Sequence, residues 1–463
     1  MKSTRTWVGM TVLALPLIAG TIDLNDLFDY QGQEAPTYIT QDNTPANNHI
    51  SNAGATLGRV LFYDKKLSIN NTVACASCHQ QEFAFSDPSI QSKGFDGGVT
   101  GRHSMRLVNG RYSEESAFFW DERASVLEFQ TVMPIQDHIE MGFSGTNGQP
   151  SIDSLINKLN ATDYYPKLVE EAFWGTELSE DRIAYALAQF VRSIQSFDSK
   201  FDEGLAQAGN INANFSNFTA QENQGKNLFI APPPAGAGCQ GCHRAPAFDI
   251  DPDAQNNGVI TVAGDTGTDL TNTKSPSLRD VVNPDGDPNG PFMHDGSLTT
   301  LEEVIEHYNL IVFDANENPN LDQRLRGPTN TGQNLNLSDD QKAALVAFLK
   351  TLTGEAIYTA AQWSDPFDAQ GNLSVLPLGR VDIAGSMEVQ AFPNPCSDQL
   401  TLNLPAGNYA VSFRAVDGRL IRSMQQNGGQ QVFWVNGLPA GLFLIDVLDQ
   451  NTGQHKVIKV FKH

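Results

Sequence analysis

The sequence predicts a mainly α-helical protein in which two tandem, related units are followed by a small β-sandwich. Three observations lead to this prediction. A Cys-x-x-Cys-His motif occurs twice, amphipathic helical patterns close each copy, and short segments of alternating apolar and polar residues fill the last part of the 463-residue chain. We expect the two units at residues 21–215 and 216–356, a linker at 357–386 and the sandwich at 387–463.

Residues 1–20 have the character of a secretory signal peptide. Lys2 and Arg5 precede an apolar run from Trp7 to about Gly20, which is too short to span a bilayer. We expect cleavage near Gly20–Thr21 and export of the chain. Its formal net charge of −23 disfavours nucleic acid as a partner, because phosphate contacts need clustered Lys and Arg.

The repeated motif is Cys75-Ala76-Ser77-Cys78-His79 in the first unit and Cys239-Gln240-Gly241-Cys242-His243 in the second. This spacing is typical of c-type haem attachment, in which both thiols form thioethers and the histidine ligates the iron. The two copies use four of the five cysteines. A zinc site would need further Cys or His ligands at short spacing, and none follow; disulfide pairing is the other alternative. The sequence therefore predicts two cytochrome c-like haem domains.

The segments around the two motifs also repeat. Gly58–Phe62 precedes the first motif as Gly225–Phe229 precedes the second, and Trp120–Glu128 matches His294–Glu302. Each unit ends in an amphipathic helix with a capping residue, Ser179 or Ser338. The simplest explanation is a duplicated haem domain.

The repeat predicts that the two irons are coordinated differently. Tyr308 lies fourteen residues after His294, whereas the equivalent position after Trp120 is Pro134. A tyrosine phenolate can ligate haem iron, and proline has no side-chain ligand. We therefore expect an open first haem and a second haem capped by Tyr308. Met293 or His307 are alternative ligands of the second iron, and His103 is an alternative cap for the first.

Two residues near Pro134 fit an active pocket. Gln130 lies one helical turn before it and Glu140 six residues after it. A carboxyl group above an open haem can take a proton from peroxide and return it to the distal oxygen, and an amide can orient the ligand. Solvated helix residues are the alternative interpretation for both. Trp120 is a candidate electron carrier between the haems, or a core residue.

These residues resemble the bacterial di-haem cytochrome c peroxidase and MauG family over roughly residues 53–354. The resemblance implies that Glu140 and Gln130 are the distal catalytic pair, that Trp120 lies between the haems, and that Tyr308 stands where peroxidases have Met and MauG-type proteins Tyr. The motifs that support it are Phe119–Asp121, Gln130–Pro134, Ile139–Gly142, Ser275–Arg279 and Met293–Gly296.

The chain departs from the family pattern at two places. The loop Lys93–Gly97 lacks the histidine that caps the peroxidatic haem in many family members, which favours a permanently open site. The family also binds calcium through an Asn side chain and backbone carbonyls. Here His103 stands at the Asn position, with Asn289 and Pro291 at the carbonyl positions, so the implied calcium site is weakened.

The C-terminal segments resemble the sorting domain of type IX secretion cargo. The resemblance implies recognition by the type IX secretion machinery, passage from the periplasm across an outer membrane, and then tail removal or surface attachment. An ordinary β-sandwich spacer is the alternative, and Cys396 within it is unpaired. The motifs are Phe392–Pro395, Asp417–Arg419, Leu438–Gly441 and Lys456–Val460.

The leading functional hypothesis is a peroxidase that reduces hydrogen peroxide, with a small cytochrome or a copper protein as electron donor. A related hypothesis is MauG-like oxidation of a side chain on a partner protein. A hypothesis of another class is a non-catalytic surface electron carrier, which requires both irons to be six-coordinate.

Overall fold

A computed structural model describes residues 20–114, 117–173, 175–327, 329, 331–376, 387–415, 420–438, 440–452 and 455–463. The chain divides into two compact units between Leu378 and Gly379. The expected signal peptide, except Gly20, and the expected turn at Asp417–Arg419 lie outside the described residues. No helix in the described ranges is long and apolar enough to cross a membrane.

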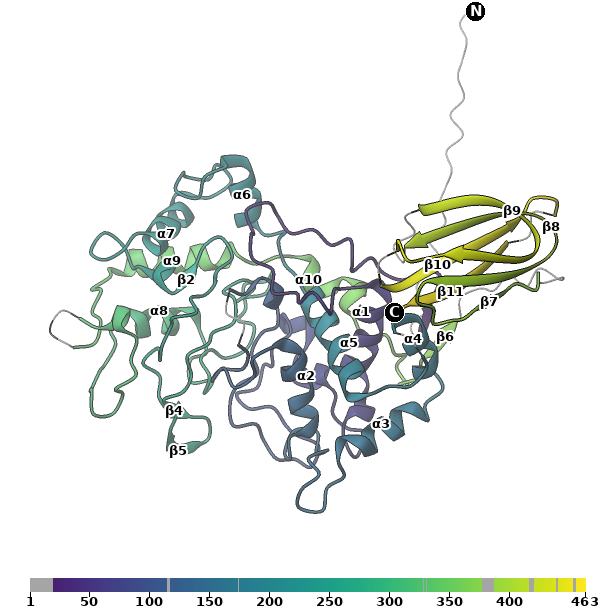
Figure 1. Ribbon diagram of the computed structural model, residues 1–463. Coiled ribbons are helices and arrows are strands. Elements are labelled where there is room, and N and C mark those ends of the chain that lie inside the picture. The colour runs from purple at the N-terminus through teal and green to yellow at the C-terminus, as the bar shows by residue number, and fades with distance from the viewer. Residues whose placement is uncertain are drawn as a thin grey trace, which may run out of the picture. The chain divides into compact units, whose positions relative to one another are not determined.

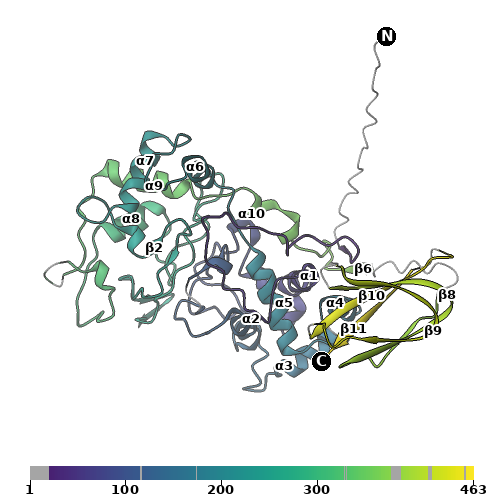
Figure 2. The ribbon, with the colours of Figure 1, turned by 45° about the horizontal axis from the view of Figure 1, so that its top comes forward.

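The first hydrophobic core of the larger unit is built around two helices that pack against each other, α1 Asn52–Tyr63 and α5 Glu180–Ser193 (Figures 1 and 2). Ser51 accepts a hydrogen bond from Gly54 N at the start of one, and Ser179 caps the other as expected. Ile183, Leu187 and Phe190 form the buried stripe. The helices of this half are α1 Asn52–Tyr63, α2 Leu127–Gln136, α3 Ile152–Asn160, α4 Tyr165–Ala172 and α5 Glu180–Ser193.

A second hydrophobic core lies further along the chain. The capping box expected between Ser338 and Gln341 is present, and further boxes begin α7 and α8, so backbone donors at these helix starts are satisfied. The helices are α6 Lys200–Ala208, α7 Ala220–Ile230, α8 Leu301–Asn309 and α9 Asp339–Lys350.

The repeated glycines mark equivalent helix crossings in the two halves. A Cβ on Gly58 in α1 would lie 1.9 Å from the Ala186 carbonyl oxygen of α5. A Cβ on Gly225 in α7 would lie 1.8 Å from the Ala344 carbonyl oxygen of α9. Both helix pairs therefore approach closely at the same point of the repeat, because only glycine leaves room for the facing backbone.

Long irregular segments connect the described helices of the second half. They contain only short strands: β2 His243–Arg244, β3 Asp249–Ile250, β4 Thr261–Val262 and β5 Asp265–Thr268. The first three residues of each Cys-x-x-Cys-His motif form a short 3-10 helix, Cys75–Ser77 or Cys239–Gly241.

The segment predicted as a linker is largely packed onto the first core. It contains α10 Ala356–Thr359 and the strand β6 Ser374–Leu376, which pairs in parallel with β1 Thr21–Asp23. Trp363 is buried and donates a hydrogen bond of 3.0 Å to the Ser193 carbonyl. No periodic pattern predicts this packing, because the helix of the segment is only four residues long.

The C-terminal unit is an antiparallel sheet with its own core. Strand β8 pairs with β9 along one edge, and along the other with β7 near its start and with β10 near its end; β11 pairs with β10. All described strands of this unit thus belong to one sheet, and the two separate sheets of a sandwich are not confirmed. The strands are β7 Gln390–Phe392, β8 Gln399–Ala415, β9 Leu420–Trp434, β10 Gly441–Asp449 and β11 His455–Lys462.

Candidate functional site: two haem cavities

The first Cys-x-x-Cys-His motif presents a histidine prepared to bind a metal. The backbone N–H of His79 donates to the Cys75 carbonyl at 3.0 Å, which fixes the turn. The ring Nδ1 lies 3.0 Å from the Phe85 carbonyl oxygen, so Nδ1–H donates and Nε2 is left as the ligating atom. Burial lowers the pKa of His79 and favours the neutral imidazole that metals require.

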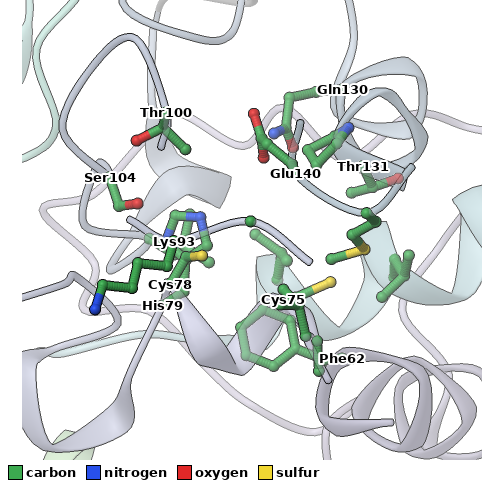
Figure 3. A pocket seen from close by; sticks show the side chains of 18 residues that line it. Phe62, Cys75, Cys78, His79, Lys93, Thr100, Ser104, Gln130, Thr131 and Glu140 are labelled. Atoms are coloured by element: carbon green, nitrogen blue, oxygen red, sulfur yellow. The ribbon is translucent and has the colours of Figure 1, made fainter. Parts of the chain in front are cut away.

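Cys75, Cys78 and His79 share a cavity with Gln130, Pro134 and Glu140. Figure 3 shows Gln130 and Glu140 on one side of this cavity, with the two cysteines and the histidine on the opposite side. The adjoining cavity, of about 820 Å³, is also lined by His79, Gln130 and Glu140. The structure therefore brings these sequence-predicted residues together, and Pro134, inside α2, contributes only its ring.

Glu140 is held in an environment that disfavours its charge. Burial, and to a smaller extent the nearby charge of Asp137, raise the pKa of its carboxyl to about 7 against the opposing charge of Arg123. The Glu140 backbone N–H donates to Asp137 Oδ1 at 2.9 Å, and its carbonyl accepts from Phe95 N at 3.0 Å. A carboxyl with a pKa near 7 can both accept and donate a proton at neutral pH.

The Lys93–Gly97 loop packs tightly on the Glu140 segment, a contact that the sequence motifs do not predict. A Cβ on Gly94 would lie 1.9 Å from the Ile139 carbonyl oxygen, so only glycine permits this approach. The hydroxyl-bearing residues Thr100 and Ser104 also line the cavity and were not anticipated. The sequence signal for this contact was Gly94 itself, in a loop that lacks the histidine found in many family members.

The second motif opens into a separate cavity of about 540 Å³, lined by Cys239, Cys242, His243 and Tyr308. Burial lowers the pKa of His243 to about 4, so its imidazole is neutral. Tyr308 projects from α8, and burial, followed by proximity to Cys242, raises the pKa of its phenol, while Asn257 opposes the shift. A cation at this place would be needed to favour the phenolate.

The alternative ligands of the second iron are placed less favourably than Tyr308. Met293 shares a smaller neighbouring cavity with His243 and Tyr308, but its Sδ accepts a hydrogen bond of 3.2 Å from Asn257 Nδ2. His307 Nε2 lies 3.0 Å from the Asn257 carbonyl oxygen, and His307 lines neither cavity.

Trp120 lies between the two cavity systems. It lines the cavity that contains His79 and Glu140, and also the smaller cavity beside the second haem cavity, which shares His243 and Tyr308 with it. Its indole N–H donates to the His103 carbonyl at 2.7 Å, so the ring orientation is fixed. Trp120 is both buried and placed between the two cavity systems, so its interpretations as a core residue and as an electron carrier are compatible.

The residues expected to hold calcium do not form an oxygen cage through His103. Its Nδ1 lies 3.0 Å from the Ser89 carbonyl oxygen and its Nε2 lies 3.3 Å from Ser86 Oγ. Calcium prefers oxygen ligands, and both ring nitrogens are already engaged, which also disfavours His103 as a haem cap. Asn289 Oδ1 is buried without a hydrogen-bond partner. Calcium at Asn289 and Pro291 stays a prediction.

The chain is similar to known proteins over most of the larger unit. The methylamine utilization protein MauG of Methylophilus methylotrophus is 30% identical over 320 residues, which cover 68% of this chain and 86% of MauG. The chain belongs to the di-haem cytochrome c peroxidase and MauG family. The family model of di-haem cytochrome c peroxidase matches residues 52–210.

Two further relatives agree with this membership. Cytochrome c551 peroxidase of Nitrosomonas europaea is 29% identical over 324 residues, which cover 67% of this chain and 82% of that enzyme. The crystal structure of a MauG-like protein associated with microbial copper homeostasis has a TM-score of 0.58 and 29% identity, covering 72% of this chain and 98% of that one.

Residues 390–460 match the model of a secretion system C-terminal sorting domain, which indicates export by the type IX route.

Family membership implies a peroxidase-type oxidoreductase with two c-type haems, and the two cavities fit that cofactor. Each offers two thiols and a half-buried histidine, whose lowered pKa keeps it neutral. The larger volumes, about 820 and 540 Å³, fall within the range of about 300–1,000 Å³ usual for cofactor sites. Cys75, Cys78 and His79 would hold one haem, and Cys239, Cys242 and His243 the other.

Proposed function

We propose that the chain is a di-haem peroxidase that reduces hydrogen peroxide to water at the first haem, with electrons supplied through a second haem capped by Tyr308. The observation that supports this most is the contrast between the two cavities. Opposite His79 stand Gln130, Pro134 and Glu140, none of them a strong iron ligand, whereas Tyr308 shares its cavity with His243.

The first haem, when bound, supplies the site at which peroxide is reduced. Glu140 would take a proton from one oxygen of the peroxide and return it to the other, which would leave as water. Gln130 orients the peroxide by donating from its side-chain amide. The carboxyl of Glu140 suits this role because its pKa of about 7 makes acceptance and release of the proton comparably favourable.

The chemical balance requires an external reductant. One peroxide, two protons and two electrons give two water molecules. A small cytochrome or a copper protein would supply the electrons to the second haem. Trp120 would stand on their way to the first haem, since it lines the first haem cavity and the smaller cavity beside the second.

A second candidate function is MauG-like oxidation of an amino-acid side chain on a partner protein. Tyr308 and the MauG relatives favour it, as does Phe95, which stands in a loop that holds a histidine in many peroxidases. Substrate assays separate the two: peroxide-dependent oxidation of a reduced cytochrome supports the peroxidase, and covalent change of a partner side chain supports the alternative.

The coordination proposal is tested by electron paramagnetic resonance of the oxidised holoprotein. One high-spin and one low-spin iron in equal amounts are expected. Two low-spin irons that stay low-spin on reduction and do not react with peroxide would instead identify a non-catalytic electron carrier. A Tyr308→Phe variant, which should perturb only the low-spin signal, assigns that signal to the second haem.

A further inference from the structure

Arg106 is a buried cation without the carboxylate partner that the buried Arg192 and Arg279 have. It is only 9% exposed, and its Nε is buried with no hydrogen-bond partner. Its Nη2 reaches one neutral acceptor, the Ser277 carbonyl, at 3.3 Å. Within the described part of the chain, no carboxylate is in ion-pair contact with it. Burial without a paired anion is unfavourable, and it lowers the pKa of Arg106 to about 10.

Arg192 and Arg279, which are more deeply buried, show what is missing. Arg59, also buried, has no ion pair, but its Nε donates to the Ser364 carbonyl at 2.6 Å and its guanidinium lies over the Phe28 ring. Arg192 makes a two-pronged ion pair with Glu128, and its Nη2 lies 3.0 Å from Oε2. Arg279 does the same with Asp202, with distances of 2.8 and 2.9 Å. A guanidinium fork matches a carboxylate geometrically, which is why these pairs are tolerated in the interior.

The position of Arg106 indicates where its anion comes from. Arg106 lines the cavity that contains His79 and Glu140. It also lines the smaller cavity beside the second haem cavity, which shares His243 and Tyr308 with it. Its charge is felt at His243, whose pKa it helps to lower. The acid nearest in effect, Asp280, is not in ion-pair contact with Arg106: its Oδ1 accepts from Gly354 N at 2.9 Å and from the Tyr358 hydroxyl at 3.1 Å, and its Oδ2 is buried without a hydrogen-bond partner.

We propose that Arg106 is a shared anchor for the propionate carboxylates of both haems. Each haem has two such carboxylates, and burial of these anions is as unfavourable as burial of an unpaired guanidinium. Pairing them satisfies Arg106 Nε and places one positive charge between the two irons. This inference depends on the presence of two haems and not on which reaction they perform.

The consequence is electrostatic and is shared by both haems. A fixed positive charge favours the reduced, less positive form of each iron, so Arg106 raises both reduction potentials. Arg106→Gln should therefore shift the reduction equilibrium of both haems toward the oxidised form by about tenfold, which corresponds to about 59 mV for one electron.

The test is spectroelectrochemical titration of the holoprotein with both haems attached. Arg111→Gln is the matched control, since Arg111 pairs with Asp42 near the surface and lines none of the cavities described above. Its potentials should equal those of the unaltered protein. Unchanged potentials in Arg106→Gln, or a shift confined to one haem, overturn the shared anchor.

Arg106→Lys keeps the test informative if the Gln variant does not accumulate with both haems. Lysine retains the charge but lacks the two-pronged geometry, so the propionates are paired less tightly and should titrate at higher pH. The pH dependence of both potentials should therefore move to higher pH. Potentials and pH dependence identical to those of the unaltered protein overturn the proposal.

Discussion

Glu140→Gln is the substitution that tests the proposed chemistry most directly. Glutamine has almost the same size as glutamate but cannot accept or release the proton, and general acid–base assistance is typically worth about 10²–10⁴ in rate. We expect the second-order rate constant for the reaction with peroxide to fall by that factor. Both haems should remain attached, because Glu140 lies on the side of the cavity opposite the cysteines.

The pH dependence follows from the environment of the carboxyl. Burial, and then Asp137, raise the pKa of Glu140 from 4.5 to about 7. The ionised fraction is therefore about one tenth at pH 6 and about one hundredth at pH 5, and the rate should fall tenfold per pH unit below 7. Because the pKa is higher in the folded state, its contribution to stability is full below about pH 4.5 and is lost as pH rises through 7.

Stopped-flow absorbance of the Soret band after mixing with peroxide provides the measurement. Glu82→Gln serves as the control, since Glu82 is exposed on the short helix Gln81–Phe83 and lines no haem cavity described above. Asp137→Asn should shift the pH profile to lower pH, because it removes the like charge but keeps an Oδ1 acceptor for Glu140 N. A Glu140→Gln rate within threefold of the parent, with the same pH profile, refutes the reasoning.

The remaining predictions concern the second haem, Trp120 between the two haem cavities, and the fold. Tyr308→Phe should change the absorption and magnetic spectra of one haem only; identical spectra would remove Tyr308 as a ligand. Trp120→Phe loses the hydrogen bond to the His103 carbonyl and should slow electron exchange between the haems without slowing the initial peroxide reaction, as followed by stopped-flow spectra. Gly225→Ala places a Cβ 1.8 Å from the Ala344 carbonyl oxygen and should lower the free energy of unfolding by about 1–3 kcal/mol, measured by thermal unfolding. Gly267→Ala, whose Cβ would make only an ordinary contact of 3.5 Å with Val262 Cγ2, should have little effect.

Local signals in the sequence were reliable predictors of local structure. Ser179 and Ser338 cap helices as expected, because capping depends only on residues within one turn. The repeat also placed Gln130, Pro134 and Glu140 around one cavity, since equivalent positions in a duplicated unit occupy equivalent places. Whether Tyr308 ligates iron stays a prediction.

Long-range packing was not readable from these patterns. Trp363 packs on the first core from a segment with no sustained periodicity, so composition alone suggested a linker. Gly94 and Arg106 were missed for a related reason. The importance of Gly94 depends on its approach to the Ile139 carbonyl, which is distant in sequence. The importance of Arg106 depends on the absence of a paired carboxylate around it in the fold, which no local pattern reveals.

The pairing of β1 with β6 has a consequence for maturation of the exported chain. Thr21 would be the first residue left by cleavage after Gly20, and it is also the first residue of β1, aligned with Ser374. Such a cut removes the Gly20 hydrogen bonds to Pro366 and Ser374 but leaves the Leu24 N–H bonded to the Leu376 carbonyl. Cleavage after Gly20, or loss of the residues after Leu376, would thus leave β1 paired with β6. The first and last strands of the processed larger unit would remain hydrogen-bonded to each other.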